Sequence, residues 1–352
     1  MWKQAGLALL SVGLLGGCYE GGEQFGDVDA RAVTVNGVSL NGLSLNGLSL
    51  NGLSLNGLSL NGLSLNGLSL NGLSLNGLSL NGLSLNGLSL NGTDFVGVVE
   101  DDGVWQERSG EQLIGMVFSL ELDVEGESVP LDLMIEDRYV DIDSGFDDIQ
   151  LYELRVRVAG SDDWIDPCQD EDGVGHPAIP LQNYWDTESG DRIDDADVIS
   201  WSCTTGVLAH CVQWGYRPWA EAEDCKKKDK KGKWKKCKDV SLRDHHQACT
   251  RMARADYCGD GDTWTITGTQ IDIWDNLEPQ LQARAGDWDI EAEWTPEGAW
   301  CLSDIRQQAW KDEGLYPSCG KKKDKRWDRR ASKCGKLKNR RSLLVSSFNG
   351  DI

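Results

Sequence analysis

Residues 241–261 read SLRDHHQACTRMARADYCGDG, and this stretch decides most of what the sequence says about the fold. Ser241 followed three positions later by Asp244 is a variant of the capping box that begins helices, and Gly259 is suited to end one. Small and apolar residues recur between these limits at the spacing of one helical face: Ala248, Met252 and Ala255. The stretch therefore predicts a helix with one face to bury.

A second, shorter helix is expected at residues 204–213, where Gly215 and Pro218 would end it. Upstream, three segments alternate apolar and polar residues with the period of a strand: 112–122, 129–135 and 149–158. Downstream, the pattern predicts further strands: a hairpin at 263–273, and a pair formed by 289–294 and 299–302. These elements predict an α+β fold in which an antiparallel sheet packs against two or more helices.

Ten of the 11 cysteines lie after residue 167: Cys168, Cys203, Cys211, Cys225, Cys237, Cys249, Cys258, Cys301, Cys319 and Cys334. An even number is typical of a disulfide-rich exported domain. Zinc is not expected, because the cysteines lack paired C-x2-C spacing and histidine partners. Two disulfides are predicted because each would bracket a basic stretch, namely Cys225 with Cys237 and Cys319 with Cys334. The connectivity of the other six cysteines stays open.

The first 18 residues, MWKQAGLALLSVGLLGGC, hold one positive charge and an apolar run too short to span a membrane as a helix. Their small residues before Cys18 resemble the bacterial lipobox, in which cleavage exposes the cysteine for acylation. The sequence therefore predicts a signal peptide at 1–17 and lipid attachment at Cys18, followed by a linker that ends at residue 35. A plain secretory signal is the alternative. Tyr19 favours the outer membrane, by resemblance to known sorting signals.

From residue 36 to 92 the chain repeats a five-residue unit, once as NGVSL and then ten times as NGLSL. Each unit offers a short Leu-Ser-Leu strand and an Asn-Gly corner. Because five is odd, a straight strand would present serine to the core in every second unit, whereas a chain that turns at each Asn-Gly would not. Two interpretations stay open: a flexible, low-complexity tether that lifts the domain off the membrane, and a short β-solenoid that weakly resembles pentapeptide-repeat proteins.

The formal net charge is −22, yet two short stretches are strongly basic. Residues 226–238 hold nine Lys and one Asp, and residues 321–341 hold twelve Lys or Arg and two Asp. In an otherwise acidic chain, such islands predict local contact with a polyanion rather than specific recognition of nucleic acid. The candidate contacts are Lys226, Lys227, Lys228 and Trp234 in the first island, and Lys321, Lys322, Lys323 and Trp327 in the second. The candidate partners are lipopolysaccharide, anionic polysaccharide, extracellular nucleic acid or another envelope protein. The alternative is that both islands are solvated or fold back on the acidic sheet.

Residues 94–200 are acidic, with 30 Asp or Glu and only five Arg. Most of these carboxylates are expected to be solvated on outward faces of the sheet. The clusters at 141–148 and 170–172 lack the spacing of a calcium-binding loop. The sequence therefore predicts surface acidity here, and no metal or cofactor.

Four separated blocks carry a family resemblance: HPAIPLQNYWD (176–186), SCTTGVLAHCVQWGYRPW (202–219), HHQACTRMARADYCGDG (245–261) and EAEWTPEGAWC (291–301). Together they resemble the ADYC domain of bacterial lipoproteins and secreted proteins, which is named after the string at 255–258. The resemblance implies a domain over 93–345, with an acidic β part at 94–200, a helical and disulfide-rich part at 201–345, and a tail at 346–352. It implies an exported setting and no assigned reaction.

The signature does contain acid and base groups, and a hydrolase that uses His245, His246 and Asp256 is the alternative function. Adjacent histidines on a helix point about 100° apart, however, so they do not converge on one substrate atom. We expect instead that Arg254 and Asp256 form a buried ion pair at the helix end, and that the neighbouring cysteines lie in disulfides. The sequence thus predicts a membrane-anchored surface lipoprotein that serves binding or envelope organisation, without catalytic residues.

Overall fold

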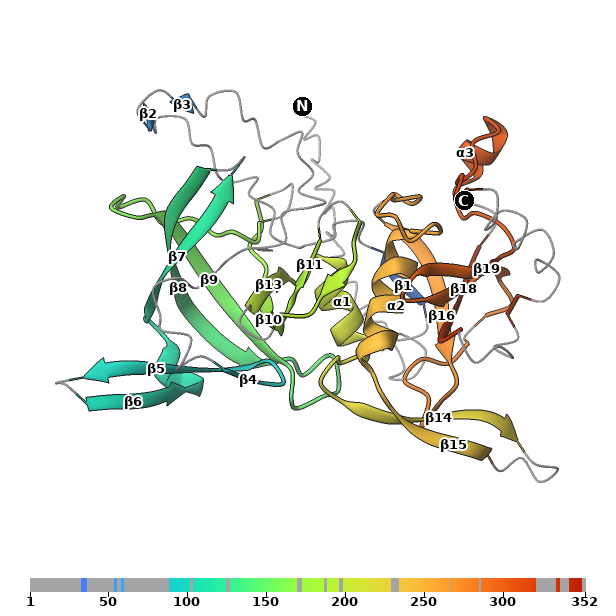
Figure 1. The fold of residues 1–352 in the computed structure, drawn as a ribbon, viewed down its shortest axis with the longest axis horizontal. Coiled ribbons are helices and arrows are strands. Elements are labelled where there is room, and N and C mark those ends of the chain that lie inside the picture. The colour runs from blue at the N-terminus through green and yellow to red at the C-terminus, as the bar shows by residue number, and fades with distance from the viewer. Residues whose placement is uncertain are drawn as a thin grey trace, which may run out of the picture.

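The computed structural model describes residues 33–36, 54–55, 58–59, 89–101, 104–124, 127–169, 173–186, 189–195, 199–228, 234–266, 268–284, 286–320, 334–335 and 342–349. This part of the chain is mostly antiparallel sheet, with three α-helices and four disulfides. Figure 1 shows one large sheet on the left, a second on the right, and the helices α1 and α2 between them. None of the described helices is long and apolar enough to cross a membrane.

The first large sheet has the strand order β13-β10-β9-β8-β7, and each neighbouring pair is antiparallel. Its strands are β7 (Val117–Val124), β8 (Glu127–Val140), β9 (Gln150–Val158), β10 (Ala178–Gln182) and β13 (Ile199–Cys203). The three strands expected from alternation are confirmed as β7, β8 and β9, although β7 begins after a 3-10 helix, η4 (Gly110–Leu113). One face buries a single apolar cluster that includes Phe118, Leu133, Tyr152 and Trp201.

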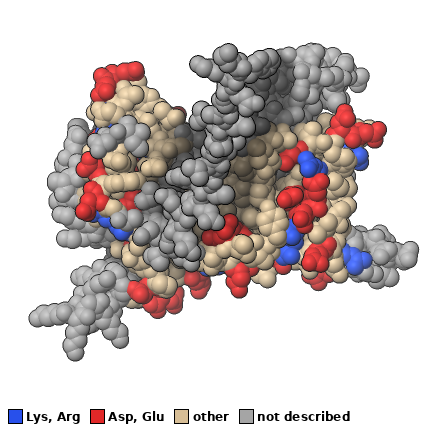
Figure 2. Space-filling model, turned by 180° about the vertical axis from the view of Figure 1, so that it is seen from behind, with Lys and Arg blue, Asp and Glu red and all other residues tan. Residues whose placement is uncertain are grey.

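Arginines pair with part of the acidity of this sheet. Arg157 lies 2.9 Å from Asp132 and Arg155 lies 2.7 Å from Glu136, and each pair joins β8 to β9. On the face turned to the viewer, Figure 2 shows blue and red side chains next to one another at the right. Partly exposed pairs such as these contribute about 1 kcal/mol or less, so they shape the surface more than they stabilise the fold.

A smaller sheet, β4-β5-β6, adjoins the first one and consists of β4 (Ser89–Asn91), β5 (Asp94–Asp101) and β6 (Val104–Ser109). Thr93 fixes it in place, because its carbonyl accepts a 3.1 Å hydrogen bond from the Tyr152 hydroxyl. The same hydroxyl accepts a 2.9 Å bond from the backbone N–H of Phe95. The chain that leaves the repeat is therefore held to the first sheet by buried hydrogen bonds.

The second large sheet has the order β1-β16-β20-β18-β19. Its strands are β1 (Val33–Asn36), β16 (Thr269–Asp275), β18 (Asp289–Thr295), β19 (Gly298–Leu302) and β20 (Leu344–Phe348). The predicted pairing of 289–294 with 299–302 is confirmed as β18 with β19, which a tight turn joins at Gly298.

Two expectations for this region are wrong. Residues 346–348 are not in a tail, because β20 is the middle strand of the sheet and all of it is buried. Residues 263–273 do not form a hairpin, since only the part from Thr269 onward is a strand and it pairs with β1 and β20. Both errors concern pairing between distant segments, which local alternation does not encode.

The α-helices are α1 (Val207–Gln213), α2 (Arg243–Arg254) and α3 (Gln308–Asp312). Leu208 and Val212 of α1 join an apolar cluster with residues of β9 and β10, while Ala248 and Met252 of α2 join one with the second sheet. The predicted end of α2 at Gly259 is wrong. The helix ends at Arg254, its C-cap residue Ala255 takes the left-handed conformation with φ 53°, and its N-cap residue makes no side-chain capping bond.

The remaining strands are short or lie in a long hairpin: β2 (Ser54–Leu55), β3 (Leu58–Ser59), β11 (Tyr184–Trp185), β12 (Arg192–Ile193), β14 (Glu221–Lys228), β15 (Trp234–Ser241) and β17 (Leu277–Glu278). The hairpin β14–β15 projects from the body at the lower right of Figure 1. The first basic island lies in this hairpin, at the end away from the body.

The disulfides are Cys168–Cys203, Cys211–Cys249, Cys258–Cys319 and Cys301–Cys334. The predicted pair Cys319–Cys334 is therefore wrong, because each of these cysteines bonds to the core of the second half rather than to the other. Cys237 is disulfide-bonded and its backbone lies opposite that of Cys225 in the hairpin. The side chain of Cys225 lies outside the described residues, so its pairing with Cys237 stays a prediction.

The predicted signal peptide, Cys18 and most of the repeat also lie outside the described residues. Of the repeat, the structure describes its first residue in β1, the short pair β2–β3, and its last four residues, 89–92, which include β4. Whether the tract is flexible or a solenoid is thus left as predicted.

Candidate functional site

The signature at 255–258 lies directly after α2, where the chain turns toward the second sheet. Asp256 is fully buried, and its carboxylate accepts hydrogen bonds from three successive backbone N–H groups, those of Gly259, Asp260 and Gly261, at 2.7, 3.1 and 3.1 Å. Three such donors satisfy a buried carboxylate that would otherwise be costly to remove from water. The aspartate therefore acts as the centre of the turn.

The ion-pair partner of Asp256 is Arg251, at 2.5 Å, and not Arg254 as the sequence suggested. Arg251 is 1% exposed and also donates to the carbonyl of Pro296 at 3.1 Å. It further contacts Asp191 and the carbonyl of Ser189, so it joins α2 to the loop before β12. Arg251 rather than Arg254 is the partner because the chain turns back after Ala255 and brings the Asp256 carboxylate to Arg251.

Arg254 is also buried, and it donates to the carbonyl of Gly261. Burial lowers the pKa of Arg254 to about 10, although the negative charge of Asp256 raises it in part. Gly190 leaves room for both guanidinium groups, since a Cβ on it would lie 2.6 Å from Arg254 Nη1 and 2.8 Å from Arg251 Nη1. The two arginines thus hold the end of α2 against the loops around Gly190 and Gly261.

Tyr257 belongs to a second buried network, which sequence reasoning missed. Its hydroxyl donates to Glu291 Oε1 at 2.6 Å, and Arg306 donates to the two oxygens of Glu291 at 2.7 and 2.8 Å. Arg306 also donates to the carbonyl of Met252 at 2.8 Å, near the end of α2, and Ser346 donates to Glu291 at 2.7 Å. Burial and the nearby Glu291 carboxylate raise the pKa of Tyr257 well above its usual range. The network joins α2, β18 and β20.

Gly259 has a role other than the predicted end of the helix. With φ +67°, it lies so close to the β18–β19 turn that a Cβ would stand 2.1 Å from the carbonyl oxygen of Glu297. On the other side of this contact, Gly298 has φ +97°, and a Cβ there would stand 2.6 Å from the backbone nitrogen of Gly259. The signature turn and this β-turn therefore touch backbone to backbone.

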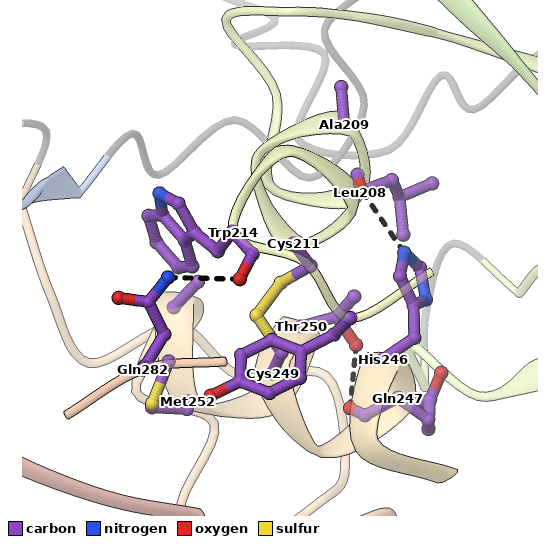
Figure 3. The surroundings of a disulfide bond; sticks show 12 residues. Leu208, Ala209, Cys211, Trp214, His246, Gln247, Cys249, Thr250, Met252 and Gln282 are labelled. Atoms are coloured by element: carbon purple, nitrogen blue, oxygen red, sulfur yellow. Dashed lines mark hydrogen bonds between the residues drawn. A yellow bond between two sulfur atoms is a disulfide. The ribbon is translucent and has the colours of Figure 1, made fainter. Parts of the chain in front are cut away.

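The two adjacent histidines are buried and lie against different neighbours. His246 Nε2 donates to the carbonyl of Leu208 at 3.0 Å, as Figure 3 shows beside the Cys211–Cys249 disulfide. Its ring lies 5.5 Å from that of Trp185, whereas the ring of His245 stacks on Tyr216 at 6.3 Å. Burial lowers the pKa of His246 to about 4, so the side chain is neutral at neutral pH. His245, His246 and Asp256 consequently do not form one acid–base group.

For the residues predicted to contact a polyanion, the structure describes part of the backbone of the first island. Backbone pairing sets Lys227 opposite Lys235 and Lys228 opposite Trp234 in the β14–β15 hairpin. The side chains of Lys226, Lys227, Lys228 and Trp234, like the whole of residues 321–333, lie outside the described residues. Within the described ranges, no group of three or more His, Cys, Asp or Glu side chains is arranged to hold a metal ion.

Part of the missed network had a signal in the sequence. Glu291 lies in the block EAEWTPEGAWC, where a carboxylate alternates with apolar residues in a buried strand and needs a partner. Arg306 had no such signal, because it lies in an irregular segment between β19 and α3.

Residues 110–308, more than half of the chain, match the family model of the ADYC domain. No curated protein and no solved structure matches the chain.

Proposed function

The chain belongs to the ADYC domain family, and on that premise we propose that it is an exported bacterial lipoprotein whose domain serves binding or envelope organisation rather than catalysis. The observation that carries the proposal is the use of the signature itself. Asp256, Tyr257 and Cys258 are all committed to contacts inside the fold: a turn, a buried network and a disulfide. A signature with these partners has the properties of a scaffold.

Export is supported by the covalent framework. Four disulfides join described segments that are 33 to 61 residues apart in the sequence, and bonds of this kind persist in oxidising compartments. Anchoring at Cys18 rests on the lipobox-like sequence MWKQAGLALLSVGLLGGC, and Tyr19 supports placement in the outer membrane. Several acyl chains on one cysteine would hold the domain firmly at the membrane surface.

We propose an anionic partner, bound by the two basic islands. The first island lies in the projecting β14–β15 hairpin, on the side of the molecule away from the acidic first sheet (Figure 1). The second follows Cys319 and surrounds Cys334, which are bonded to Cys258 and Cys301 in the same half. Lysines bind phosphate as point charges, so lipopolysaccharide phosphates or anionic polysaccharide suit these islands.

The anionic partner can be tested by retention on lipopolysaccharide or heparin resin. Changing Lys226–Lys228 and Lys321–Lys323 to Gln should lower the salt concentration that elutes the protein, because binding by lysines falls as salt screens the charges. Arg155→Gln with Arg157→Gln is the control: it removes two positive charges from the first sheet, against six in the Lys variant, and should leave retention unchanged. Equal retention of the Lys variant and the unchanged protein would refute the polyanion proposal.

The hydrolase alternative is the weaker proposal. It requires His245, His246 and Asp256 to reach a substrate, and these side chains are 3%, 0% and 0% exposed. A pull-down from envelope fractions with the mature ectodomain distinguishes the two. Capture of an envelope polyanion or protein, lost in the Lys variant, supports the binding module. Turnover of an ester or peptide substrate that His246→Gln abolishes would support the hydrolase instead.

A further inference from the structure

The edge strand of the second sheet, β1, comes from the segment of the chain at the N-terminal end of the repeat. β1 pairs antiparallel with β16 in four steps: Val33 with Asp272, Thr34 with Ile271, Val35 with Gln270, and Asn36 with Thr269. It is the outermost strand of this sheet, and Figure 1 labels it beside β16 and α2. The residues that provide it, Val33, Thr34 and Val35, are β-branched and therefore suited to a strand.

A loop of the same domain covers the end of the β16 edge that lies beyond β1. The last residues of β16 are already covered, because the N–H of Asp275 donates to the carbonyl of Gln282 at 3.2 Å. The loop then passes close to Asp272, whose carboxylate accepts a 3.2 Å bond from the N–H of Gly286. β1 pairs with Thr269 to Asp272, the residues that precede this covered end. An uncovered edge would present backbone groups for aggregation.

The other end of the repeat is held as well. β4 pairs with β5, and the next residues are fixed by the contacts of Thr93 with Asp148 and Tyr152. Gly92 lies against the Trp219 indole, where a Cβ would stand 3.1 Å from Nε1. Both ends of the segment between Asn36 and Ser89 are therefore bound to one domain.

We propose that residues 33–36 are a permanent strand of this domain, so that the NGLSL repeat is a closed excursion from the domain and not a linear stalk beneath it. The entropy of closing a loop grows only slowly with its length, so an excursion of this size is compatible with a stable strand. The inference does not depend on Cys18 being acylated. If the proposed anchor is present, residues 19–32 alone set the distance to the membrane, at most about 50 Å when extended.

A cysteine pair tests the register in the full-length protein. Val35→Cys with Gln270→Cys should form a disulfide within one chain, because directly opposite residues have Cβ atoms about 5 Å apart. Leu55→Cys with Gln270→Cys is the matched control. It keeps the cysteine at position 270 and moves the second cysteine to a position inside the repeat. Peptide mapping should find the 35–270 bridge at least tenfold more often than the 55–270 bridge. Equal frequencies, or bridges between two chains, would overturn the proposal.

Hydrogen exchange gives a test without added cysteines. Deleting residues 33–36 should speed the exchange of those amides at 269–272 that point toward β1 at least tenfold, and it should leave the amides of β18 unchanged. Deleting one repeat unit, residues 51–55, should change neither. If the first deletion leaves the exchange at 269–272 as it was, β1 does not protect β16 and the inference is wrong.

Discussion

The buried histidines make the fold sensitive to acid. His210 and His246 have their pKa lowered from 6.5 to about 4 because burial penalises the charged form. Between these pH values the unfolded chain binds protons that the folded chain does not, so the free energy of unfolding falls as the pH drops from 6.5 to 4, by roughly 3 kcal/mol for each histidine. Burial raises the pKa of Asp275 to about 6. The folded chain therefore binds this proton more readily than the unfolded chain, and the resulting gain in the free energy of unfolding at low pH offsets the loss from about one histidine.

Denaturant titrations between pH 7 and pH 4 check this expectation. His246→Gln should reduce the fall in the free energy of unfolding between pH 7 and pH 4, since glutamine can still donate to Leu208 and carries no titratable proton. His176→Gln, at a partly exposed position, is the control and should keep the full slope. An unchanged slope in His246→Gln would show that burial of this ring does not drive the acid response.

Residue roles could be predicted from the sequence only where local spacing decides them. The signature was correctly expected to hold a buried carboxylate and disulfide-bonded cysteines. The partner of Asp256 was wrong, since choosing Arg251 over Arg254 depends on how the chain folds back after Ala255. Arg306 was missed because its contacts to Glu291 and to α2 cross about 15 and 54 residues of sequence.

Among the elements, the turn after α2 depends on its contact with the β18–β19 turn. Gly259→Ala should lower the free energy of unfolding by several kcal/mol, because a Cβ would overlap the Glu297 carbonyl and the backbone would have to shift. Gly268→Ala is the matched control: φ is +89° there too, but the Cβ would meet no atom within 4 Å. That variant should cost only about 1 kcal/mol of backbone strain. Thermal unfolding of both variants measures the difference, and equal losses would exclude the close contact as the cause.

Helices and strands were predicted correctly where the hydrophobic periodicity and the turn residues at their ends indicated the same element. β7 to β9, the pair β18–β19 and the positions of α1 and α2 follow from alternation and helical spacing. β20 was missed because a short strand near the chain end enters the sheet between two distant strands. The wrong pair Cys319–Cys334 has a similar cause: nearness in sequence does not show which cysteines meet in space.

The proposed lipoprotein must be exported and acylated. Cys18→Ala should abolish incorporation of an alkynyl fatty acid and move the protein from the membrane fraction to a soluble one. The reason is that the sulfur of Cys18 is the proposed attachment point and no described helix could hold the chain in a membrane. Labelling that persists in Cys18→Ala would contradict the lipoprotein assignment.

The Cys211–Cys249 disulfide links α1 to α2, and these helices lie between the two large sheets. The signature lies in the interior, whereas the basic hairpin lies at the periphery (Figure 1). This separation explains why the motif that identifies the family is not the surface proposed to bind a partner. It also explains why charge could be mapped from the sequence more readily than the core, since charge runs are local and core contacts are not.

The most direct test of the scaffold role is the stability of Asp256→Asn in the mature ectodomain. The change keeps the shape but leaves Arg251 without a buried counter-charge, and it should lower the free energy of unfolding by about 3 kcal/mol or more. Asp260→Asn, the same change four residues on at an exposed position, should lie within about 0.5 kcal/mol of the unchanged protein. If Asp256→Asn is as stable as Asp260→Asn in denaturant unfolding, the signature is not the scaffold described and its aspartate must serve another purpose.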